Sequence, residues 1–136
     1  MIKKYYFFAL SFIVGFVSLF SLSLSTEESR WLKETEIQKL YVRLFDVDWN
    51  PNINAAVPVG DAIIETKKIV GVEIIPVIFI TNRTLTNLSD SLISELSNKI
   101  YKKIFAKLSL FENQTTKEIQ LDCDWTETTR ARYFEL

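Results

Sequence analysis

Two long apolar runs constrain the fold of this chain more than any other feature of its sequence. They are "LYVRLFDVDW" at residues 40–49 and "PVIFIT" at residues 76–81. Both carry apolar side chains on both faces, whereas a strand with one face in water alternates apolar and polar residues. The runs therefore predict strands that are covered on both sides, as in a parallel sheet. A third run, "EIQLDCDW" at residues 118–125, predicts another strand.

The segments between these runs predict the connections. Residues 88–108 place apolar side chains three and four positions apart, which indicates an amphipathic helix that Ser89 can cap. Residues 50–60 are rich in asparagine and proline and predict a loop, and residues 61–75 favour a short helix or an irregular crossover. A last helix is expected to begin at Thr126, its N-cap.

This order of elements predicts an α/β fold with parallel strands and crossover helices. Three parallel strands make a thin domain, so we interpret residues 40–136 as the N-terminal part of a (β/α) TIM-type barrel, truncated at its C-terminus. The alternative is a complete three-stranded unit. Residues 26–39 precede this domain as a linker with a short helix.

The first 25 residues have the layout of a secretory leader. Lys3 and Lys4 are followed by an uncharged run from Tyr5 to Ser25. Small residues allow cleavage before Thr26, whereas residues 5–24 are also long enough to span a bilayer as a signal-anchor. In either case the two lysines keep the N-terminus inside. We therefore expect an exported protein of the cell envelope or extracellular space, which contacts the membrane if the leader is kept.

Composition excludes several classes of function. The chain contains no histidine, so it cannot form a Ser-His-Asp or Cys-His catalytic group by itself. Its single cysteine, Cys123, cannot form an intramolecular disulfide, and its apolar strand predicts a buried, inert thiol. The sequence after the leader carries 14 basic and 17 acidic side chains, and this balance argues against nucleic acid as a partner.

Polar side chains gather where the three predicted strands end. Because the carboxyl ends of parallel strands form one edge, these side chains are expected to meet there. Two aspartates at positions i and i+2 share one face of a strand. The residues are Asp46 and Asp48 after the first strand, Asn82 and Arg83 after the second, and Asp122 and Asp124 after the third.

Converging carboxylates shift one another's pKa values, so one can act as an acid while another stays ionised. Glycoside hydrolysis needs such a pair, and Asp122 and Asp124 are the candidate catalytic residues. Asp46, Asp48, Asn82 and Arg83 are candidates for substrate binding, together with the flat rings of Trp49 and Trp125. No dedicated metal site is predicted, but the aspartate pairs could alternatively bind Ca²⁺ or Mg²⁺, or simply end strands. A nucleotide-sugar transferase is disfavoured because no glycine-rich phosphate loop is visible.

The third strand resembles the D-G-I-D-I-D-W-E strand of chitinase-type barrel glycosidases. Residues 121–125, "LDCDW", match its I-D-I-D-W part. Two positions depart from the pattern: residues 119 and 120 are isoleucine and glutamine in place of Asp-Gly, and Thr126 stands where the family has its catalytic glutamate. Glu127 lies one position too late.

The stretches "YVRLFDVDW", "IPVIFITN" and "EIQLDCDWTETTRARYF" together resemble an uncharacterised family of exported proteins with a glycosidase-like (β/α) barrel. The resemblance covers most of residues 38–136 and implies architecture and export more than a reaction. It favours a carbohydrate-binding or glycosidase-related protein. The alternative is a non-catalytic envelope protein, or a remnant, whose acidic strand ends are structural or bind a cation.

Overall fold

The computed structural model describes residues 21–66, 68–112 and 114–136. Most of the predicted leader, residues 1–20, lies outside the described residues. Within the described part of the chain, none of the helices combines the length and the apolar character needed to cross a bilayer.

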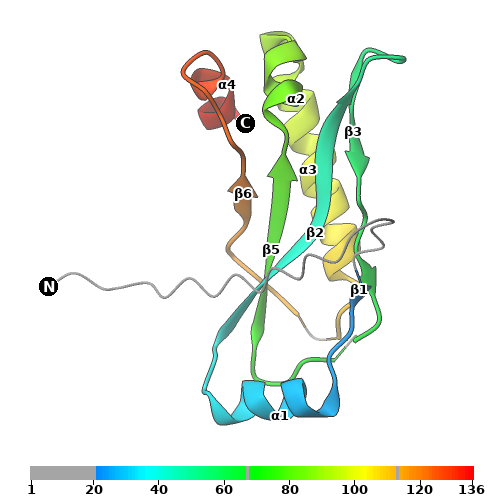
Figure 1. Ribbon diagram of the computed structural model, residues 1–136, viewed down its shortest axis with the longest axis vertical. Helices are drawn as coiled ribbons and strands as arrows, with labels where there is room; N and C mark the ends of the chain where they lie inside the picture. Colours follow the sequence, from blue (N-terminus) through cyan, green and yellow to red (C-terminus); the bar gives the residue numbers. More distant parts are fainter. Residues whose placement is uncertain (1–20, 67, 113) are drawn as a thin grey trace, which may run out of the picture.

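Six strands, four α-helices and one short 3₁₀ helix form the described part of the chain (Figure 1). In chain order they are β1 (Ser21–Leu22), α1 (Thr26–Glu34), β2 (Lys39–Asn50), β3 (Ala55–Val59), β4 (Ile63–Ile64), β5 (Glu73–Ile80), α2 (Asn82–Asn87), η1 (Asp90–Leu92), α3 (Ile93–Leu108), β6 (Gln120–Asp122) and α4 (Arg130–Glu135).

The main sheet has four strands in the order β3-β2-β5-β6 (Figure 1). Strands β2, β5 and β6 are parallel, and β3 pairs antiparallel with β2 at one edge. Each parallel strand thus lies beside the next parallel strand in sequence. The predicted α/β fold with parallel strands is confirmed, and the described strands form an open sheet. The carboxyl ends of β2, β5 and β6 lie together at the upper edge in Figure 1.

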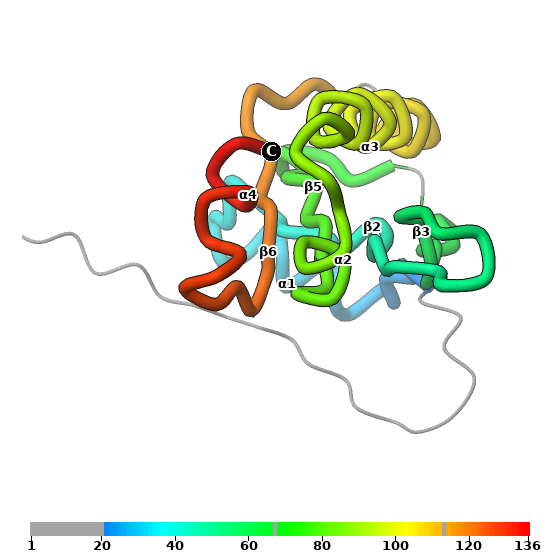
Figure 2. The backbone as a smooth tube through the Cα atoms, turned by 90° about the horizontal axis from the view of Figure 1, so that it is seen from above, coloured from blue at the N-terminus to red at the C-terminus, as the bar shows by residue number. Residues whose placement is uncertain are grey.

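The hydrophobic core lies between this sheet and α3, which covers one face (Figure 2). Sheet residues such as Phe45 and Ile78 are 1% and 0% exposed and belong to the same core as Ile104 of α3. We call the other side of the sheet the open face. Asp46 and Asp48, near the carboxyl end of β2, point to this open face and away from the core.

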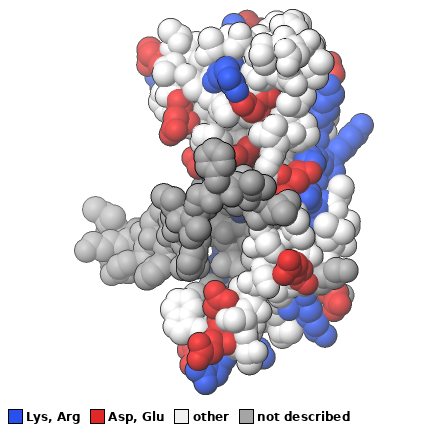
Figure 3. Space-filling view, turned by 45° about the vertical axis from the view of Figure 1, so that its right-hand side comes forward, with Lys and Arg blue, Asp and Glu red and all other residues white. Residues whose placement is uncertain are grey.

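Helix α3 forms because its apolar residues share one stripe, while its lysines face outward. The buried residues recur every three to four positions: Ile93, Leu96, Ile100, Ile104 and Leu108. Lys103 and Lys107 bind Asp61, with nitrogen–oxygen distances of 2.8 and 3.9 Å, and so fix the connection between β3 and β4. The helix holds four lysines and one glutamate, and basic side chains, Lys or Arg, gather along the right-hand edge of Figure 3.

The predicted helix at residues 88–108 is confirmed in its main part but starts later. Leu88 has an extended backbone, with φ −69° and ψ 128°, and ends the separate helix α2. Ser89 precedes η1 without a side-chain capping bond. The regular helix begins only at Ile93, because extended backbone at Leu88 and Ser89 separates it from α2 and the 3₁₀ turn η1 precedes it.

The structure corrects one predicted connection and decides between the two alternatives for another. Residues 50–60 are not only a loop, because β3 lies within them and pairs with β2 in the register Val47 to Pro58. An edge strand tolerates this proline, since one side of it needs no ladder hydrogen bond. For residues 61–75, where a short helix or an irregular crossover was expected, the described residues (61–66 and 68–75) form an irregular crossover: it holds β4, which pairs with β1, and a turn at Gly71 with φ +79° before β5 begins.

The short helix expected in residues 26–39 is confirmed as α1, which Ser25 caps and in which Glu28 completes a capping box. Strand β6 is shorter than the predicted 118–125. Helix α4 starts after Thr129, whose hydroxyl accepts a 2.9 Å hydrogen bond from the backbone N–H of Thr126.

Candidate functional site

Strand register brings aspartates from two non-adjacent strands to one row of the open face. Asp46 of β2 pairs with Phe79 of β5, and Phe79 pairs with Asp122 of β6. Side chains of paired residues leave a sheet on the same face, and neighbouring strands are about 4.8 Å apart. The Cα atoms of the two aspartates are therefore roughly 10 Å apart, with Phe79 between them.

The carboxylate of Asp46 is not free, because Arg43 donates two hydrogen bonds to it. The Arg43 Nε and Nη2 atoms donate hydrogen bonds of 2.6 and 2.7 Å to the two carboxylate oxygens of Asp46. The same guanidinium lies 4.6 Å from the centroid of the Phe79 ring, within the range of a cation–π contact. Arg43 and Phe79 thus belong to the site, and sequence reasoning did not select either of them.

Asp48 is held at the end of β2 by groups from β5 and α2. Its Oδ1 atom accepts hydrogen bonds from the Thr81 hydroxyl at 2.7 Å and from the Trp49 backbone N–H at 2.8 Å. Arg83, which the sequence placed near the acids, binds both carboxylate oxygens, with a distance of 3.2 Å from Nε to Oδ1. The Arg83 hydrogen bonds are the main cause that lowers the pKa of Asp48, and they outweigh its partial burial.

Asn82 serves the structure at this edge. Its side-chain oxygen accepts a 2.6 Å hydrogen bond from the hydroxyl of Thr129, which is 1% exposed. This bond ties the end of β5 to the segment between β6 and α4. The predicted substrate-binding side chain therefore positions the segment that carries Asp124 and Trp125.

Asp122 and Asp124 are the acids of the site that have no bonding partner among the described residues. Both are exposed, and neither side chain forms a hydrogen bond or ion pair with another residue of the described ranges 21–66, 68–112 and 114–136. Cys123 between them packs against the core. Burial, followed by the negative charges of Asp124 and Asp122, raises the pKa of this thiol to about 11. Cys123 is thus half-buried, and its raised pKa agrees with the inert thiol that the sequence predicted.

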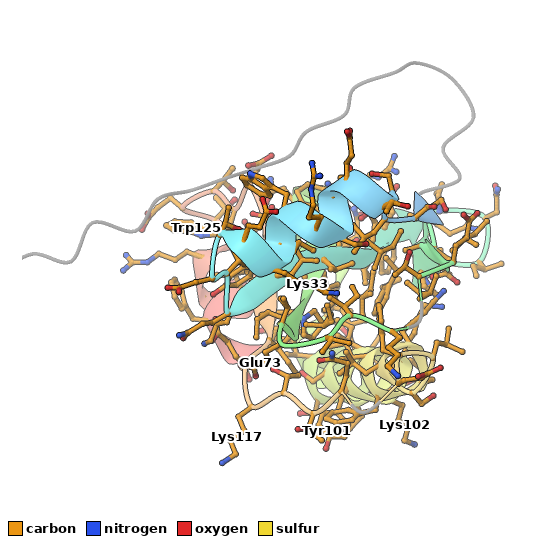
Figure 4. The ribbon with its side chains drawn as sticks, turned by 90° about the horizontal axis from the view of Figure 1, so that it is seen from below. Lys33, Glu73, Tyr101, Lys102, Lys117 and Trp125 are labelled. Atoms are coloured by element: carbon orange, nitrogen blue, oxygen red, sulfur yellow. The ribbon has the colours of Figure 1, made fainter. Side chains whose placement is uncertain are left out.

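Trp125 forms an aromatic group with two residues of α4. Its ring stacks on Tyr133 with the centroids 6.3 Å apart and meets the edge of Phe134 at 5.9 Å. Trp125 is 39% exposed and Phe134 69% exposed, so part of this apolar surface faces water. Arg130 lies 5.9 Å from both ring centroids. Figure 4 shows Trp125 on the side of the molecule away from α3.

The second tryptophan is not brought to this surface. Trp49 belongs to the core cluster and is 8% exposed. Residues i and i+1 of a strand point to opposite faces, so Trp49 lies on the α3 side while Asp48 lies on the open face. The structure therefore supports Trp125, and not Trp49, as a surface that a ligand can contact.

The acids do not converge as a metal site within the described residues. Across residues 21–66, 68–112 and 114–136, no three histidine, cysteine, aspartate or glutamate side chains lie close enough together to hold a metal ion. Two of the four aspartates already have arginine counter-ions.

Comparisons with known proteins give no relative: no family model, no curated protein and no solved structure matches this chain.

Proposed function

We propose that this chain is an exported, carbohydrate-binding α/β protein, built like the first part of a (β/α) barrel. Neighbouring parallel strands that follow one another in sequence, with a crossover helix on one face, are the arrangement of such a barrel. Polar residues occupy the opposite face and the carboxyl edge, where barrels carry their sites. The resemblance of the three strand stretches to a glycosidase-like family supports the same proposal.

The observation that carries the proposal is the pairing of two uncommitted carboxylates with an exposed aromatic group. No described residue binds the carboxylates of Asp122 and Asp124, so their oxygens can accept hydrogen bonds from sugar hydroxyls. Trp125 and Phe134 offer flat apolar surface beside them, against which the C–H faces of a sugar ring can pack. Arrangements with a few polar groups beside aromatic side chains are typical of small-ligand sites.

Binding is favoured over hydrolysis for the residues of this chain. Hydrolysis needs a carboxylic acid that stays protonated beside an ionised partner. Arg83 instead lowers the pKa of Asp48, and Arg43 forms a two-point ion pair with Asp46. Thr126 stands where the resembling strand has its glutamate, and its hydroxyl lies 3.0 Å from that of Thr128.

Isothermal titration of the full chain with neutral oligosaccharides of β-linked glucose and N-acetylglucosamine tests this proposal. Asp122→Asn, Asp124→Asn and Trp125→Ala should each weaken binding by about tenfold, since each removes one hydrogen-bonding or stacking contact. Glu65→Gln is the matched control: Glu65 is an exposed acid after β4 and should leave binding unchanged. If the unaltered chain binds none of these sugars, the proposal is wrong.

A cation is the second candidate ligand, because Asp122 and Asp124 are exposed carboxylates two positions apart and hard cations prefer oxygen ligands. Titration with Ca²⁺ and Mg²⁺ on the same variants separates the two. Saturable Ca²⁺ binding that Asp122→Asn abolishes, without sugar binding, would favour the cation. If neither ligand binds, the acids are structural ends of their strands.

Export is proposed from the leader-like residues 1–25 alone. Cell fractionation of the producing organism tests it, together with the mass of the mature chain. Cleavage before Thr26 distinguishes a secretory signal from an anchor that keeps residues 5–24 in the membrane. A chain found wholly in the cytosol would contradict export.

A further inference from the structure

An apolar groove of about 350 Å³ runs between α3 and β6, on the side of the sheet opposite the candidate sugar site. We call it the α3–β6 groove. Its apolar walls are Ile100, Tyr101 and Ile104 of α3, Ile119 and Leu121 of the β6 segment, and Leu136 after α4.

The groove exists because α3 covers only part of its face of the sheet. Ile104 of α3 is 1% exposed against the sheet, whereas Tyr101, on the flank of the same helix, is 57% exposed. Phe105 is 43% exposed and packs on Tyr101 with ring centroids 4.5 Å apart. Ile119, on the strand side, is 40% exposed. Apolar surface of this kind, gathered in one concave place, marks an interaction site.

One residue from outside α3 and the β6 segment already lines the groove. Leu136, directly after α4, lines the groove, and its backbone carbonyl accepts a 2.7 Å hydrogen bond from the Ser97 hydroxyl of α3. The groove therefore accepts an apolar side chain from a segment beside α3, and the backbone carbonyl of that residue is bound at the rim. In α/β folds, helices cover the faces of parallel strands in this way.

Two exposed lysines stand next to the apolar residues of the groove. Lys102 lies on α3 next to Tyr101, and Lys117 precedes β6 next to Ile119. Neither lysine forms an ion pair within the part of the chain that the structure describes. Figure 4 shows Lys102, Tyr101 and Lys117 on the same side of the molecule, with Lys33 of α1 on the other. A ligand with acidic side chains beside an apolar stripe complements this surface.

We propose that the α3–β6 groove binds an amphipathic helix of a partner protein, with an apolar stripe toward Tyr101 and Ile119 and acidic flanks toward Lys102 and Lys117. Recognition of this type uses apolar anchors at positions i, i+3, i+4 and i+7 of the partner helix. The groove and the sugar site lie on opposite faces of the sheet, so the two proposals are independent of each other.

Two synthetic helical peptides test this assignment on the full chain. Both carry leucines along one stripe, and they differ only in having glutamates or lysines at the flanking positions. Fluorescence anisotropy should show saturable binding of the glutamate peptide and about tenfold weaker binding of the lysine peptide. Lys102→Glu with Lys117→Glu should reverse this preference, while Lys33→Glu, the same charge change on α1, should leave it unchanged.

Tyr101→Ser with Ile119→Ser should weaken binding of the glutamate peptide by about tenfold, because it removes two apolar anchors from the groove. Both side chains are partly exposed, so circular dichroism and thermal unfolding should show an intact fold. The proposal fails if the glutamate peptide does not bind, or if both peptides bind equally. It also fails if phosphatidylglycerol vesicles, and not the peptides, bind in a manner that depends on these four residues.

Discussion

Among single residues, Asp48 is the most firmly held acid of the open face. It accepts hydrogen bonds from the Thr81 hydroxyl, the Trp49 backbone N–H and the Arg83 guanidinium, and the last is the main cause of its lowered pKa. A folded-state pKa below the ordinary value of 3.8 stabilises the fold at neutral pH. This stabilisation is lost as the pH falls from near 4 through the lower, folded-state pKa.

We therefore predict that Asp48→Asn makes the free energy of unfolding less dependent on pH below about pH 4. At pH 7 the variant should be less stable by about 1 kcal/mol, a modest value because Arg83 is largely exposed. Urea denaturation between pH 2.5 and 7 measures both effects. Identical pH dependence in the variant and the unaltered chain would contradict this account of Asp48.

Cys123 gives a second prediction. With a pKa of about 11, its thiol stays protonated at neutral pH, because its burial and the nearby charges of Asp124 and Asp122 disfavour the thiolate. Its rate of alkylation by iodoacetamide should be slow at pH 7 and should still rise about tenfold per pH unit at pH 10. A rate that levels off near pH 9, as in an exposed cysteine peptide, would show that the thiol is not shielded.

The acids of the site could be predicted from the sequence, but one partner could not. Strict alternation puts Arg43 and Asp46, three positions apart, on opposite faces of a strand. The register shifts between Arg43 and Phe45, and Leu44 and Phe45 are both buried, so one extra residue brings Arg43 to the face of Asp46. A bulge of this kind depends on pairing with neighbouring strands and leaves no mark in the periodicity of the run.

Within α3, two adjacent apolar residues differ in how much of each side chain is exposed to solvent. Ile104 is 1% exposed in the core, whereas Phe105 is 43% exposed on the flank. Ile104→Ala should lower the free energy of unfolding by about 2–4 kcal/mol through lost burial and a cavity. Phe105→Ala should cost about 1 kcal/mol or less, although it removes the larger side chain. Urea denaturation of both variants checks this, and equal losses would contradict the orientation of α3.

Elements whose apolar residues follow a clear pattern were predictable from the sequence. Elements that form only because a neighbouring strand pairs with them were not. The stripe of α3 and the two-sided apolar runs of β2 and β5 specify their structures locally. Strand β3 has asparagines before it and Pro58 within it, which are loop signals. It becomes a strand because the open edge of β2 pairs with it.

Across the whole molecule, the sheet divides the chain into two unlike sides. The α3 side holds the continuous core and the α3–β6 groove, and the open face holds the polar residues. The sequence predicted that all four aspartates meet at one edge together with Asn82 and Arg83. Instead Asp46 and Asp48 are bound by arginines, and Asp122 and Asp124 remain uncommitted. Such pairing depends on side-chain positions that only the assembled sheet determines.

This architecture predicts a gradient of stability from the centre of the sheet to its edges. Strand β5 lies between β2 and β6, and its residues Ile74, Ile78 and Ile80 are all 0% exposed. Its backbone amides can exchange with solvent only when the sheet opens globally. Strand β6 contributes three residues, and β3 contributes five to the other edge, so both can open locally at lower cost.

Amide hydrogen exchange on the full chain should therefore show the strongest protection in β5 and the adjacent residues of β2. Amides of β6 and β3 should exchange about 100-fold faster or more, which corresponds to local opening roughly 3 kcal/mol or more below the global free energy of unfolding. Binding of the glutamate peptide to the α3–β6 groove should slow exchange in β6 and leave β3 unchanged, because only β6 lines the groove. Equal protection across all four strands would show that the sheet opens as one unit.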